Sequence, residues 1–508
     1  VDAYEGPMPQ TKFVLKKSLE LGLQPLVVIN KIDKPSARPE WVVDELFDLF
    51  ITLGATDEQS EFPIMYASAK NGIAFANLED QEEAMKSGDI TPIFDLILDK
   101  VPEAPNHSEK PFRMQVVNLA YDDYLGRLGV GRVYEGTAKT GQEVVIFDNE
   151  GNKRKGKISK LFTTLGLSRV ESQEAKCGDV VTIAGISDIF VGETIGVEGT
   201  EPFAPIKVDA PTLEMDFLVN DSPFAGREGK LVTSRNILER LQKELETNVG
   251  LEVNFEKGGN RFGVSGRGEL HLSVLIETMR REGFELQVSA PQVIFKEVDG
   301  SRQEPIEQVV VNVDEVLSGT IIELLSNRKG QMTDMQTHHG QTTLQFEVPT
   351  RGLLGFRGEF VLMTKGEGMM YSSFSHYEPY KGEIPKRNVG GLISQSNGKS
   401  MKYSMFKLQD RGVFFIPPAT EIYEGMIVGE SAKPGDIMIN LTKNKQQTSV
   451  RTGGKDENML LNPIKNLTLE DALSYIGPDE YVEITPENIR LRKIYLTESE
   501  RKRNANGR

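Results

Sequence analysis

The stretch Pro25-Leu-Val-Val-Ile-Asn-Lys-Ile-Asp33 decides the fold of this 508-residue chain. Its apolar half predicts a short buried strand, and its polar half lies at the carboxyl end of that strand, where open α/β sheets bind ligands. An ionised Asp33 can accept two parallel hydrogen bonds from the ring N–H and exocyclic amine of guanine, which adenine cannot supply. Asn30 can both donate and accept, and the Lys31 stem can lie over a base. Taken alone, the letters Asn-Lys-x-Asp equally describe a polar turn after a buried strand.

A second strand and loop downstream favour the nucleotide interpretation. The apolar run 62–67 predicts another short buried strand, which ends in Ser68, Ala69 and Lys70. In GTPases this second loop offers a backbone N–H to the guanine carbonyl, at a position where adenine carries a donor. Residues 39–51, between the two strands, have apolar side chains at helical spacing, as a crossover helix requires. The combined order predicts a guanine-nucleotide fold in which these two loops bind the base.

The phosphate-binding half of such a fold is absent from the sequence. A hydrolysing domain of this type needs Gly-x4-Gly-Lys-Ser/Thr, whose backbone N–H groups hold the phosphates and whose hydroxyl holds magnesium. Gly398-Lys399-Ser400 is rejected because Ile393 stands where the earlier glycine is required. Asp123-Tyr-Leu-Gly126 resembles a magnesium loop but follows the base motif instead of preceding it. We therefore expect a fragment whose first part is not included, with no catalytic residue, no magnesium ligand and no GTP hydrolysis of its own.

Composition indicates a large multidomain protein with an uneven charge. The length predicts about three to five domains, and one cysteine, Cys177, fits a reducing cytoplasm better than a disulfide framework. No run is long enough to span a membrane. The net charge of −16 argues against a generic nucleic-acid binder. Residues 1–110 carry 10 Lys and Arg against 20 Asp and Glu, whereas residues 380–508 carry 20 against 16. This asymmetry permits a local RNA-facing surface near the C-terminus but does not establish one.

Two basic loops in that C-terminal region are candidate RNA contacts. Clusters of this kind are usually solvated faces, and the sequence leaves both interpretations open. The pair His338-His339 lacks Cys or His partners at metal spacing, so no metal ligand is assigned. The candidate RNA-contact residues are Lys386, Arg387, Lys399 and Lys402 in the first loop and Lys443, Lys445, Arg451 and Lys455 in the second.

The pattern of strands, helices and turns predicts five domains, and a multidomain fold class of α/β and β type. Residues 1–105 are the C-terminal half of a GTPase α/β domain, and glycine-punctuated strands in 106–205 suit a small closed β-barrel. Residues 206–298 have the ferredoxin-like order strand, helix, strand, strand, helix, strand, and 299–382 repeat it. Residues 383–508 are mostly short strands and loops with a basic tail that we expect to be frayed.

Longer segments resemble one group of translational GTPases. Val1-Asp-Ala-Tyr-Glu-Gly-Pro-Met-Pro-Gln-Thr11 and Gly266-Arg-Gly-Glu-Leu-His-Leu272 resemble the elongation factor G and LepA group. Arg351-Gly-Leu-Leu-Gly-Phe-Arg357, Asn388-Val-Gly-Gly-Leu-Ile-Ser-Gln-Ser-Asn-Gly-Lys399 and Val413-Phe-Phe-Ile-Pro-Pro418 are similar to the BipA (TypA) family. The likeness extends from residue 1 to about 495. The glycines at 266 and 268 before a helix favour a structural turn over a phosphate nest, with His271 in the core or at a domain interface.

The resemblance implies a cytoplasmic, monomeric, ribosome-associated GTPase that acts under stress or in the cold and in assembly of the large ribosomal subunit. It implies contacts with rRNA and A-site tRNA and no membrane. It also implies GTP or GDP with Mg²⁺ in the complete protein, with guanosine tetraphosphate in the same base pocket. The alternative is a nucleotide-independent ribosome-binding or RNA-binding module in which Asn-Lys-x-Asp is a relic. A phosphate loop and Asp-x-x-Gly-His encoded upstream of Val1 would favour the GTPase.

Overall fold

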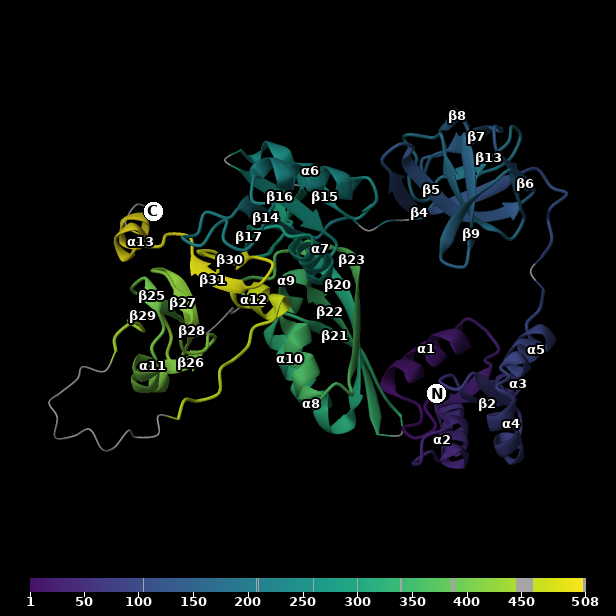
Figure 1. Ribbon diagram of the computed structural model, residues 1–508, viewed down its shortest axis with the longest axis horizontal. Helices are drawn as coiled ribbons and strands as arrows, with labels where there is room; N and C mark the ends of the chain where they lie inside the picture. Colours follow the sequence, from purple (N-terminus) through teal and green to yellow (C-terminus); the bar gives the residue numbers. More distant parts are fainter. Residues whose placement is uncertain are drawn as a thin grey trace. The chain divides into compact units, whose positions relative to one another are not determined.

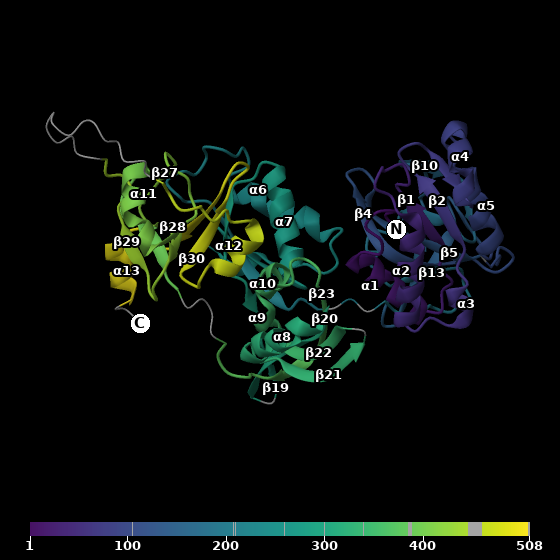
Figure 2. The same cartoon turned by 90° about the horizontal axis from the view of Figure 1, so that it is seen from below.

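The computed structural model describes residues 1–508 except 104, 207, 209, 259, 299, 339, 385–388, 445–459 and 506–508. It divides into two compact units, whose elements are labelled in Figures 1 and 2. The first unit comprises 1–105, 308–348 and 359–373, and the second comprises 106–307, 349–358 and 374–508. The five-domain division of the chain therefore stays a prediction. None of the helices in the described ranges is long and apolar enough to cross a membrane.

A small sheet near the N-terminus contains both predicted strands. β1 (Val27–Asn30) pairs in parallel with β2 (Ile64–Ser68), and β3 (Ile73–Phe75) pairs antiparallel with β2. The predicted crossover is α2 (Pro39–Thr52), which begins at a proline and buries one apolar face. This confirms the predicted order of strand, helix and strand. The other helices of this part are α1 (Pro9–Glu20), α3 (Asp57–Ser60), α4 (Gln81–Ser87) and α5 (Thr91–Lys100).

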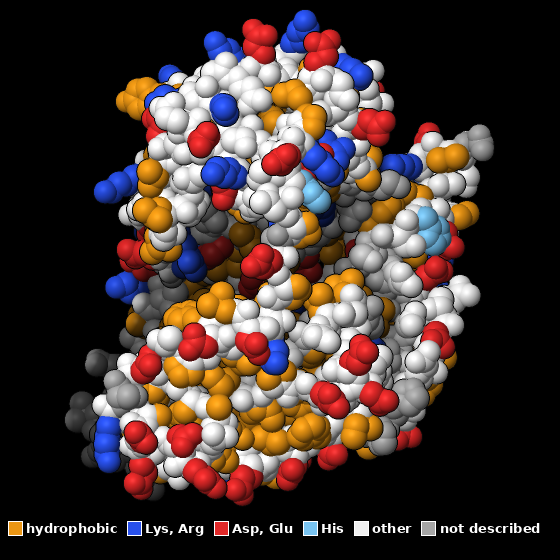
Figure 3. Space-filling view, turned by 90° about the vertical axis from the view of Figure 1, so that its right-hand side faces the viewer, with side chains coloured by type: hydrophobic (Ala, Val, Ile, Leu, Met, Phe, Trp, Pro, Cys, Tyr) orange, Lys and Arg blue, Asp and Glu red, His pale blue; other side chains and the backbone are white. Residues whose placement is uncertain are grey.

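The surface of residues 1–105 is acidic and partly apolar. In the lower half of Figure 3, Asp and Glu side chains gather over residues 1–105, with few Lys and Arg among them. Hydrophobic side chains lie between the acids, and α5 leaves Phe94, Leu98 and Val101 exposed. The acidic surface matches the excess of acids counted in residues 1–110 and is unsuited to RNA phosphates.

A five-stranded sheet follows later in the chain. Its elements are β19 (Lys296–Val298), β20 (Ser301–Asp314), α8 (Glu315–Asn327), β21 (Gln331–His338), β22 (Gln341–Pro349), α9 (Thr350–Leu353), α10 (Phe356–Met363) and β23 (Met369–Pro379). The strand order is β19-β20-β22-β21, and β23 also pairs with β20. From β20 to β23 the chain has the predicted ferredoxin-like succession. α8 begins at Glu315, where the Asp314 carboxylate accepts the Val316 N–H at 3.1 Å as a helix cap.

Residues 106–205 form an antiparallel sheet that does not close. Its strands are β4 (Arg113–Asp122), β5 (Gly126–Glu135), β7 (Glu143–Phe147), β8 (Lys153–Lys157), β9 (Lys160–Leu165), β10 (Ser168–Ser172), β12 (Val180–Ala184) and β13 (Thr194–Gly196), and β6 (Thr137–Lys139) pairs separately with β11 (Glu174–Lys176). The order β10-β9-β12-β5-β4-β13-β7-β8 leaves β8 and β10 as edges, so the predicted closed barrel is wrong for the described strands. On β8, Lys153, Lys155 and Lys157 are exposed at alternate positions, and lysines on an edge strand disfavour further pairing.

The ferredoxin-like order predicted for 206–298 is confirmed. It consists of β14 (Leu213–Val219), α6 (Ser234–Leu245), β15 (Glu252–Asn254), β16 (Arg261–Gly266), α7 (Glu269–Arg281) and β17 (Leu286–Ser289), with β18 (Gln292–Val293) beside β14. The remaining elements are β24 (Gly391–Ser394), β25 (Gly398–Lys399), α11 (Lys402–Leu408), β26 (Gly412–Phe414), β27 (Glu421–Ile422), β28 (Met426–Ser431), β29 (Ile437–Ile439), α12 (Leu469–Tyr475), β30 (Glu480–Ile484), β31 (Ile489–Lys493) and α13 (Glu498–Ala505).

The ferredoxin-like sheet continues into the C-terminal region. β17 pairs antiparallel with β30, and β31, β28, β24 and β29 follow in the same sheet, which has eleven strands when β18 beside β14 and β26 beside β28 are included. α7 and α12 pack against each other in both views (Figures 1 and 2). Both regions also contribute to one hydrophobic core. Because Val288 and Val482 are paired across almost two hundred residues, local periodicity carries no sign of this continuity.

The basic C-terminal tail is helical rather than frayed. Arg501 donates hydrogen bonds to the carbonyls of Tyr495 at 2.9 Å and Leu496 at 2.6 Å. The Thr497 hydroxyl accepts the Glu500 N–H at 3.3 Å and so caps α13. The prediction of a frayed tail is therefore wrong for residues 501–505, while 506–508 lie outside the described residues.

Two carboxylates in the second unit are fully buried, and one of them ties the ferredoxin-like region to the C-terminal strands. Glu285, the residue before β17, accepts the backbone N–H groups of Gly226, Glu228 and Gly229 at 2.6 to 2.8 Å. Glu483 of β30 accepts the hydroxyls of Tyr423 at 2.7 Å and Ser222 at 2.8 Å, and pairs with Arg490 at 3.1 Å. Burial raises the pKa of Tyr423 well above its ordinary value, so its hydroxyl stays a hydrogen-bond donor. The two carboxylates thus join segments from distant parts of the chain.

Candidate functional site

The two predicted base-reading loops lie together because β1 and β2 are parallel. Asn30 and Ala67 are register partners, so the loops that follow begin at the same edge of the sheet. The Asn30 side-chain oxygen accepts the backbone N–H of Lys31 at 2.8 Å and that of Ala69 at 3.0 Å. Asn30 therefore links the two loops directly. Since the Ala69 N–H is bonded to Asn30, a guanine carbonyl in this pocket would compete with that bond.

Asp33 is held in the charged form that base recognition requires. The Ser68 hydroxyl donates to Asp33 Oδ1 at 2.6 Å, and Ser68 itself is buried. This hydrogen bond, assisted by the charges of Lys70 and Lys34, holds the pKa of Asp33 below its usual value. Protonation would remove the acceptors only as the pH falls through that lowered pKa. Asp33 is thus ionised throughout the neutral range and can accept two hydrogen bonds.

Lys31 has an unusual backbone conformation and a partner that the sequence analysis missed. Its φ is 70°, in the left-handed region that residues with a side chain rarely adopt. The Lys31 ammonium lies 2.7 Å from Asp2 Oδ2, and this hydrogen bond raises the pKa of Lys31. Asp2 belongs to a segment quoted above only for its family resemblance. No local signal pairs residues 2 and 31, because their contact requires the folded sheet.

The two sequence segments that resemble phosphate or magnesium loops lie away from the predicted base-reading loops in the sequence. Asp123 lies in the exposed turn between β4 and β5, 3.8 Å from the ammonium of Lys243. Ser400, the last residue of the rejected Gly-Lys-Ser sequence, donates its hydroxyl to the Pro417 carbonyl at 3.0 Å and accepts the Thr420 N–H at 3.0 Å. Both candidates have structural roles where they lie, so no phosphate or magnesium ligand is assigned.

The structure brings parts of the two predicted basic loops together. The Met401 N–H donates to the Leu441 carbonyl at 2.8 Å, and the Ser404 hydroxyl donates to the Lys443 carbonyl. The start of α11 therefore lies beside the segment that contains Lys443. We call the exposed side chains Lys399, Lys402 and Lys443 the α11 surface. The other predicted RNA-contact residues, Lys386, Arg387, Lys445, Arg451 and Lys455, lie outside the described residues.

The Gly266–Glu269 turn is structural, as predicted. Glu269 begins α7, and its buried carboxylate accepts the Gly355 N–H at 3.3 Å and the Ser474 hydroxyl at 3.0 Å. Burial raises the pKa of Glu269. His271 Nε2 lies 2.9 Å from the side-chain oxygen of Asn248, and burial lowers its pKa. The contact with Asn248 agrees with the packing role predicted for His271.

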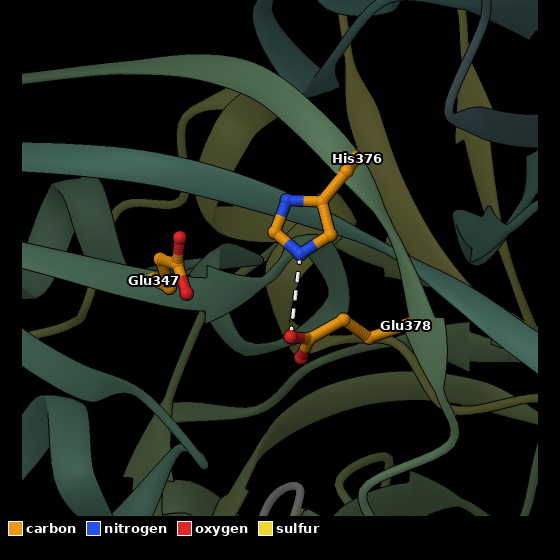
Figure 4. A group of neighbouring side chains, drawn as sticks. All are labelled: Glu347, His376 and Glu378. Carbon is orange, nitrogen blue, oxygen red and sulfur yellow. Dashed lines mark ion pairs between the residues drawn. The ribbon is translucent and has the colours of Figure 1, made fainter.

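A second histidine takes part in an ion network. His376 Nε2 lies 3.2 Å from Glu378 Oε1, and its ring points toward that carboxylate in Figure 4. Lys381 Nζ lies 2.8 Å from the other oxygen of Glu378. The hydrogen bond from Lys381 and, to a smaller extent, that from His376 lower the pKa of Glu378. The Glu378 carboxylate therefore forms ion pairs with neighbouring side chains of the same fold. The side chains of His338 and His339 lie outside the described residues, and the absence of a metal ligand stays a prediction.

Comparison with known proteins identifies relatives along nearly the whole chain. Residues 1–103 match the elongation factor Tu GTP binding domain, 126–196 match elongation factor Tu domain 2, 301–388 match the elongation factor G C-terminus, and 389–498 match the TypA/BipA C-terminal domain. The large ribosomal subunit assembly factor BipA of Synechocystis is 52% identical over 97% of this chain and 82% of its own length. Proteins with the same name in Bacillus subtilis and Escherichia coli K12 are 49% and 48% identical, each over 99% of this chain and 82% of their own length.

Proposed function

The chain belongs to the TypA/BipA family of GTPases, and on that premise we propose that it is a guanine-nucleotide-dependent factor in assembly of the large ribosomal subunit. The observation that carries the proposal is the link between the two base-reading loops through Asn30, beside an ionised Asp33. The names of the curated relatives support the ribosomal role. GTP and Mg²⁺ serve the family as substrate and cofactor. In such factors the nucleotide orders loops that favour one arrangement of domains, and hydrolysis releases them.

The same base pocket makes guanosine tetraphosphate a candidate regulator. Asp33 and the loop at 68–70 contact only the base edge, which is identical in GTP, GDP and guanosine tetraphosphate. Discrimination among these nucleotides must therefore come from phosphate contacts, for which this chain supplies no assigned ligand. We accordingly propose that any tetraphosphate regulation competes directly with GTP for the base site.

The α11 surface is the proposed contact with rRNA or with A-site tRNA. Lys402 and Lys443 are exposed at neighbouring points of the backbone, and Lys407, also exposed, lies 4.7 Å from the centroid of the Tyr403 ring. Lys399 is opposite Glu421 in the β25–β27 pair, which weakens its attraction for phosphate. Lysines that contact RNA phosphates displace the counterions bound to the RNA, so such binding weakens as the salt concentration rises. We propose a cytoplasmic monomer that uses this surface on the ribosome.

Charge removal tests the RNA contact. Replacing Lys386, Arg387, Lys399 and Lys402 by Ala should weaken ribosome binding and flatten its dependence on salt. Each lost phosphate contact should lower the log–log salt slope by up to about one unit. The measurement is ribosome co-sedimentation across a salt series. Stability should change little, because Lys399 and Lys402 are exposed and surface charges contribute little to stability.

A matched control for this experiment removes four other positive charges. The exposed lysines Lys139, Lys153, Lys155 and Lys157 give the same change in net charge when replaced by Ala. If the two quadruple variants behave alike, the effect is one of net charge and not of a defined surface. Superimposed curves for the first variant and the parent would assign docking to other parts of the chain.

Nucleotide titration tests the prediction that residues 1–508 lack the phosphate contacts of a GTPase. Residues 1–508 alone should bind GDP and GTP weakly or not at all and show no GTPase activity, even with ribosomes, because phosphate contacts provide most of the charge-assisted hydrogen bonds. Fluorescence titration with a labelled guanine nucleotide measures this. Tight, magnesium-dependent binding would contradict the prediction and reveal phosphate ligands that the sequence does not display.

A further inference from the structure

The carboxylate of Asp2 binds two lysines of the base-reading loop at once. Asp2 Oδ2 lies 2.7 Å from Lys31 Nζ and 3.0 Å from Lys34 Nζ, while Oδ1 accepts the Tyr4 N–H at 2.9 Å. The Asp2 side chain is 10% exposed, whereas those of Lys31 and Lys34 are 54% and 36% exposed. One nearly buried carboxylate thus fixes two ammonium groups that otherwise face solvent.

The backbone places Asp2 beside the end of β1. The Val1 carbonyl accepts the Asn30 N–H at 2.8 Å, and the Ala3 N–H donates to the Asn30 carbonyl at 2.8 Å. Asp2 and Asn30 form a parallel bridge. Lys31 follows Asn30 and adopts the left-handed backbone conformation. Two contacts fix its position: the Asn30 side chain accepts its backbone N–H, and the Asp2 carboxylate binds its ammonium.

Asp33 is a second carboxylate near these lysines, and Lys34 is close enough to lower its pKa. It is two residues after Lys31 and one before Lys34, and its observed hydrogen-bond donor is the Ser68 hydroxyl. Within the described residues no lysine or arginine nitrogen lies within 4.0 Å of its carboxylate. An ammonium bound to Asp33 would occupy the acceptors that the ring N–H and exocyclic amine of guanine need.

We propose that Asp2 is a positioning residue that secures guanine selectivity by holding Lys31 and Lys34 away from Asp33. The inference rests on the proposed function, since it assumes a purine base on Asp33. When Asp2 is charged, the ammonium groups of Lys31 and Lys34 are paired with it and not with Asp33. The Asp33 carboxylate oxygens then remain available to accept hydrogen bonds from guanine. Without that charge, the flexible Lys34 side chain turns to Asp33 as the remaining carboxylate, and the second hydrogen bond to guanine weakens.

Guanosine and inosine distinguish this role from a purely structural one. Inosine lacks the exocyclic amine and so makes one hydrogen bond to Asp33 where guanosine makes two. Equilibrium dialysis of each nucleoside against residues 1–508 measures the ratio of affinities. Asp2→Asn should reduce the guanosine preference by about fivefold, as expected for an exposed ion pair that competes with a charge-assisted hydrogen bond. Asp2→Glu, which retains the charge, should keep most of the preference.

A second-site variant makes the test specific. In Asp2→Asn combined with Lys34→Met, the competing ammonium is removed and the guanosine preference should return. The proposal would be overturned if Asp2→Asn lost affinity equally for guanosine and inosine, or if the double variant did not recover the guanosine preference. Asp2 would then be a structural residue.

A failure of the proposed function can be distinguished from a failure of the inference about Asp2. If the unmodified chain binds neither nucleoside, the base site itself is refuted. The positioning role is then judged without ligand, by carboxyl NMR titration of Asp33. Its pKa should fall further in Asp2→Asn, as Lys34 pairs with it, and return in the double variant. An Asp33 titration that is the same in all three proteins would overturn the inference.

Discussion

Asp33→Asn is expected to turn the base preference from guanine toward xanthine. Xanthine carries a carbonyl where guanine has its exocyclic amine, and an amide side chain can donate to that carbonyl where a carboxylate cannot. The Ser68 hydroxyl can still hold the remaining side-chain oxygen, so the loop keeps its geometry. We expect the ratio of GTP to XTP affinity to fall by about 100-fold or more, because a site built for one hydrogen-bond pattern strongly rejects the other. Competition of the two nucleotides measures it, in a chain extended by a phosphate loop and switch segments.

The control for this change is Asp48→Asn, an equal loss of charge on the exposed face of α2. It should leave the GTP preference unchanged. If Asp33→Asn also leaves it unchanged, Asp33 does not read the base and the strand-end pocket has another use. The outcome also bears on Asp2, because Asp2→Asn should weaken guanine selectivity without creating xanthine selectivity.

Glu483→Gln is expected to destabilise the second unit by about 3 kcal/mol. Tyr423, Ser222 and Arg490 all donate to this fully buried carboxylate, and an amide replaces one of its acceptors by a donor. The change leaves a buried hydroxyl or guanidinium without its partner, which is among the costly single substitutions. Chemical unfolding followed by far-ultraviolet circular dichroism should show the loss. Hydrogen exchange in β17 and β30 should rise together, since they share one sheet.

The protein contains an internal control for this experiment. Trp41, its one tryptophan, lies in the first unit, so its fluorescence transition should be unaffected by a change in the second. Glu487→Gln, an exposed substitution in the turn after β30, should change neither transition. If Glu483→Gln unfolds no more easily than Glu487→Gln, the buried network does not hold the C-terminal strands to the ferredoxin-like sheet.

The position of the predicted base-reading residues at strand ends followed from the sequence because the pattern that places them is local. Asn30, Lys31 and Asp33 follow directly from a buried strand, and the loop at 68–70 follows from a second. Parallel pairing, implied by the crossover helix, was enough to bring the loops together. Asp2 was not predictable, because its role depends on which lysine ammonium it meets in the folded sheet. The convergence of Lys402 and Lys443 likewise required the contact between Met401 and Leu441.

The sequence by itself determined the strand–helix–strand order near the N-terminus, the two ferredoxin-like orders and the residue types of the predicted base pocket, because side-chain periodicity and hydrogen-bonding groups act over a few residues. Tertiary structure decided the open sheet in 106–205, the eleven-stranded sheet and the helical tail. Strand pairing depends on which edges meet in the folded protein, and the lysines of β8 are typical of an edge strand without specifying its partner. The buried carboxylates Glu285 and Glu483 show the same limit. Their donors come from distant segments, so only the fold distinguishes them from ordinary surface acids.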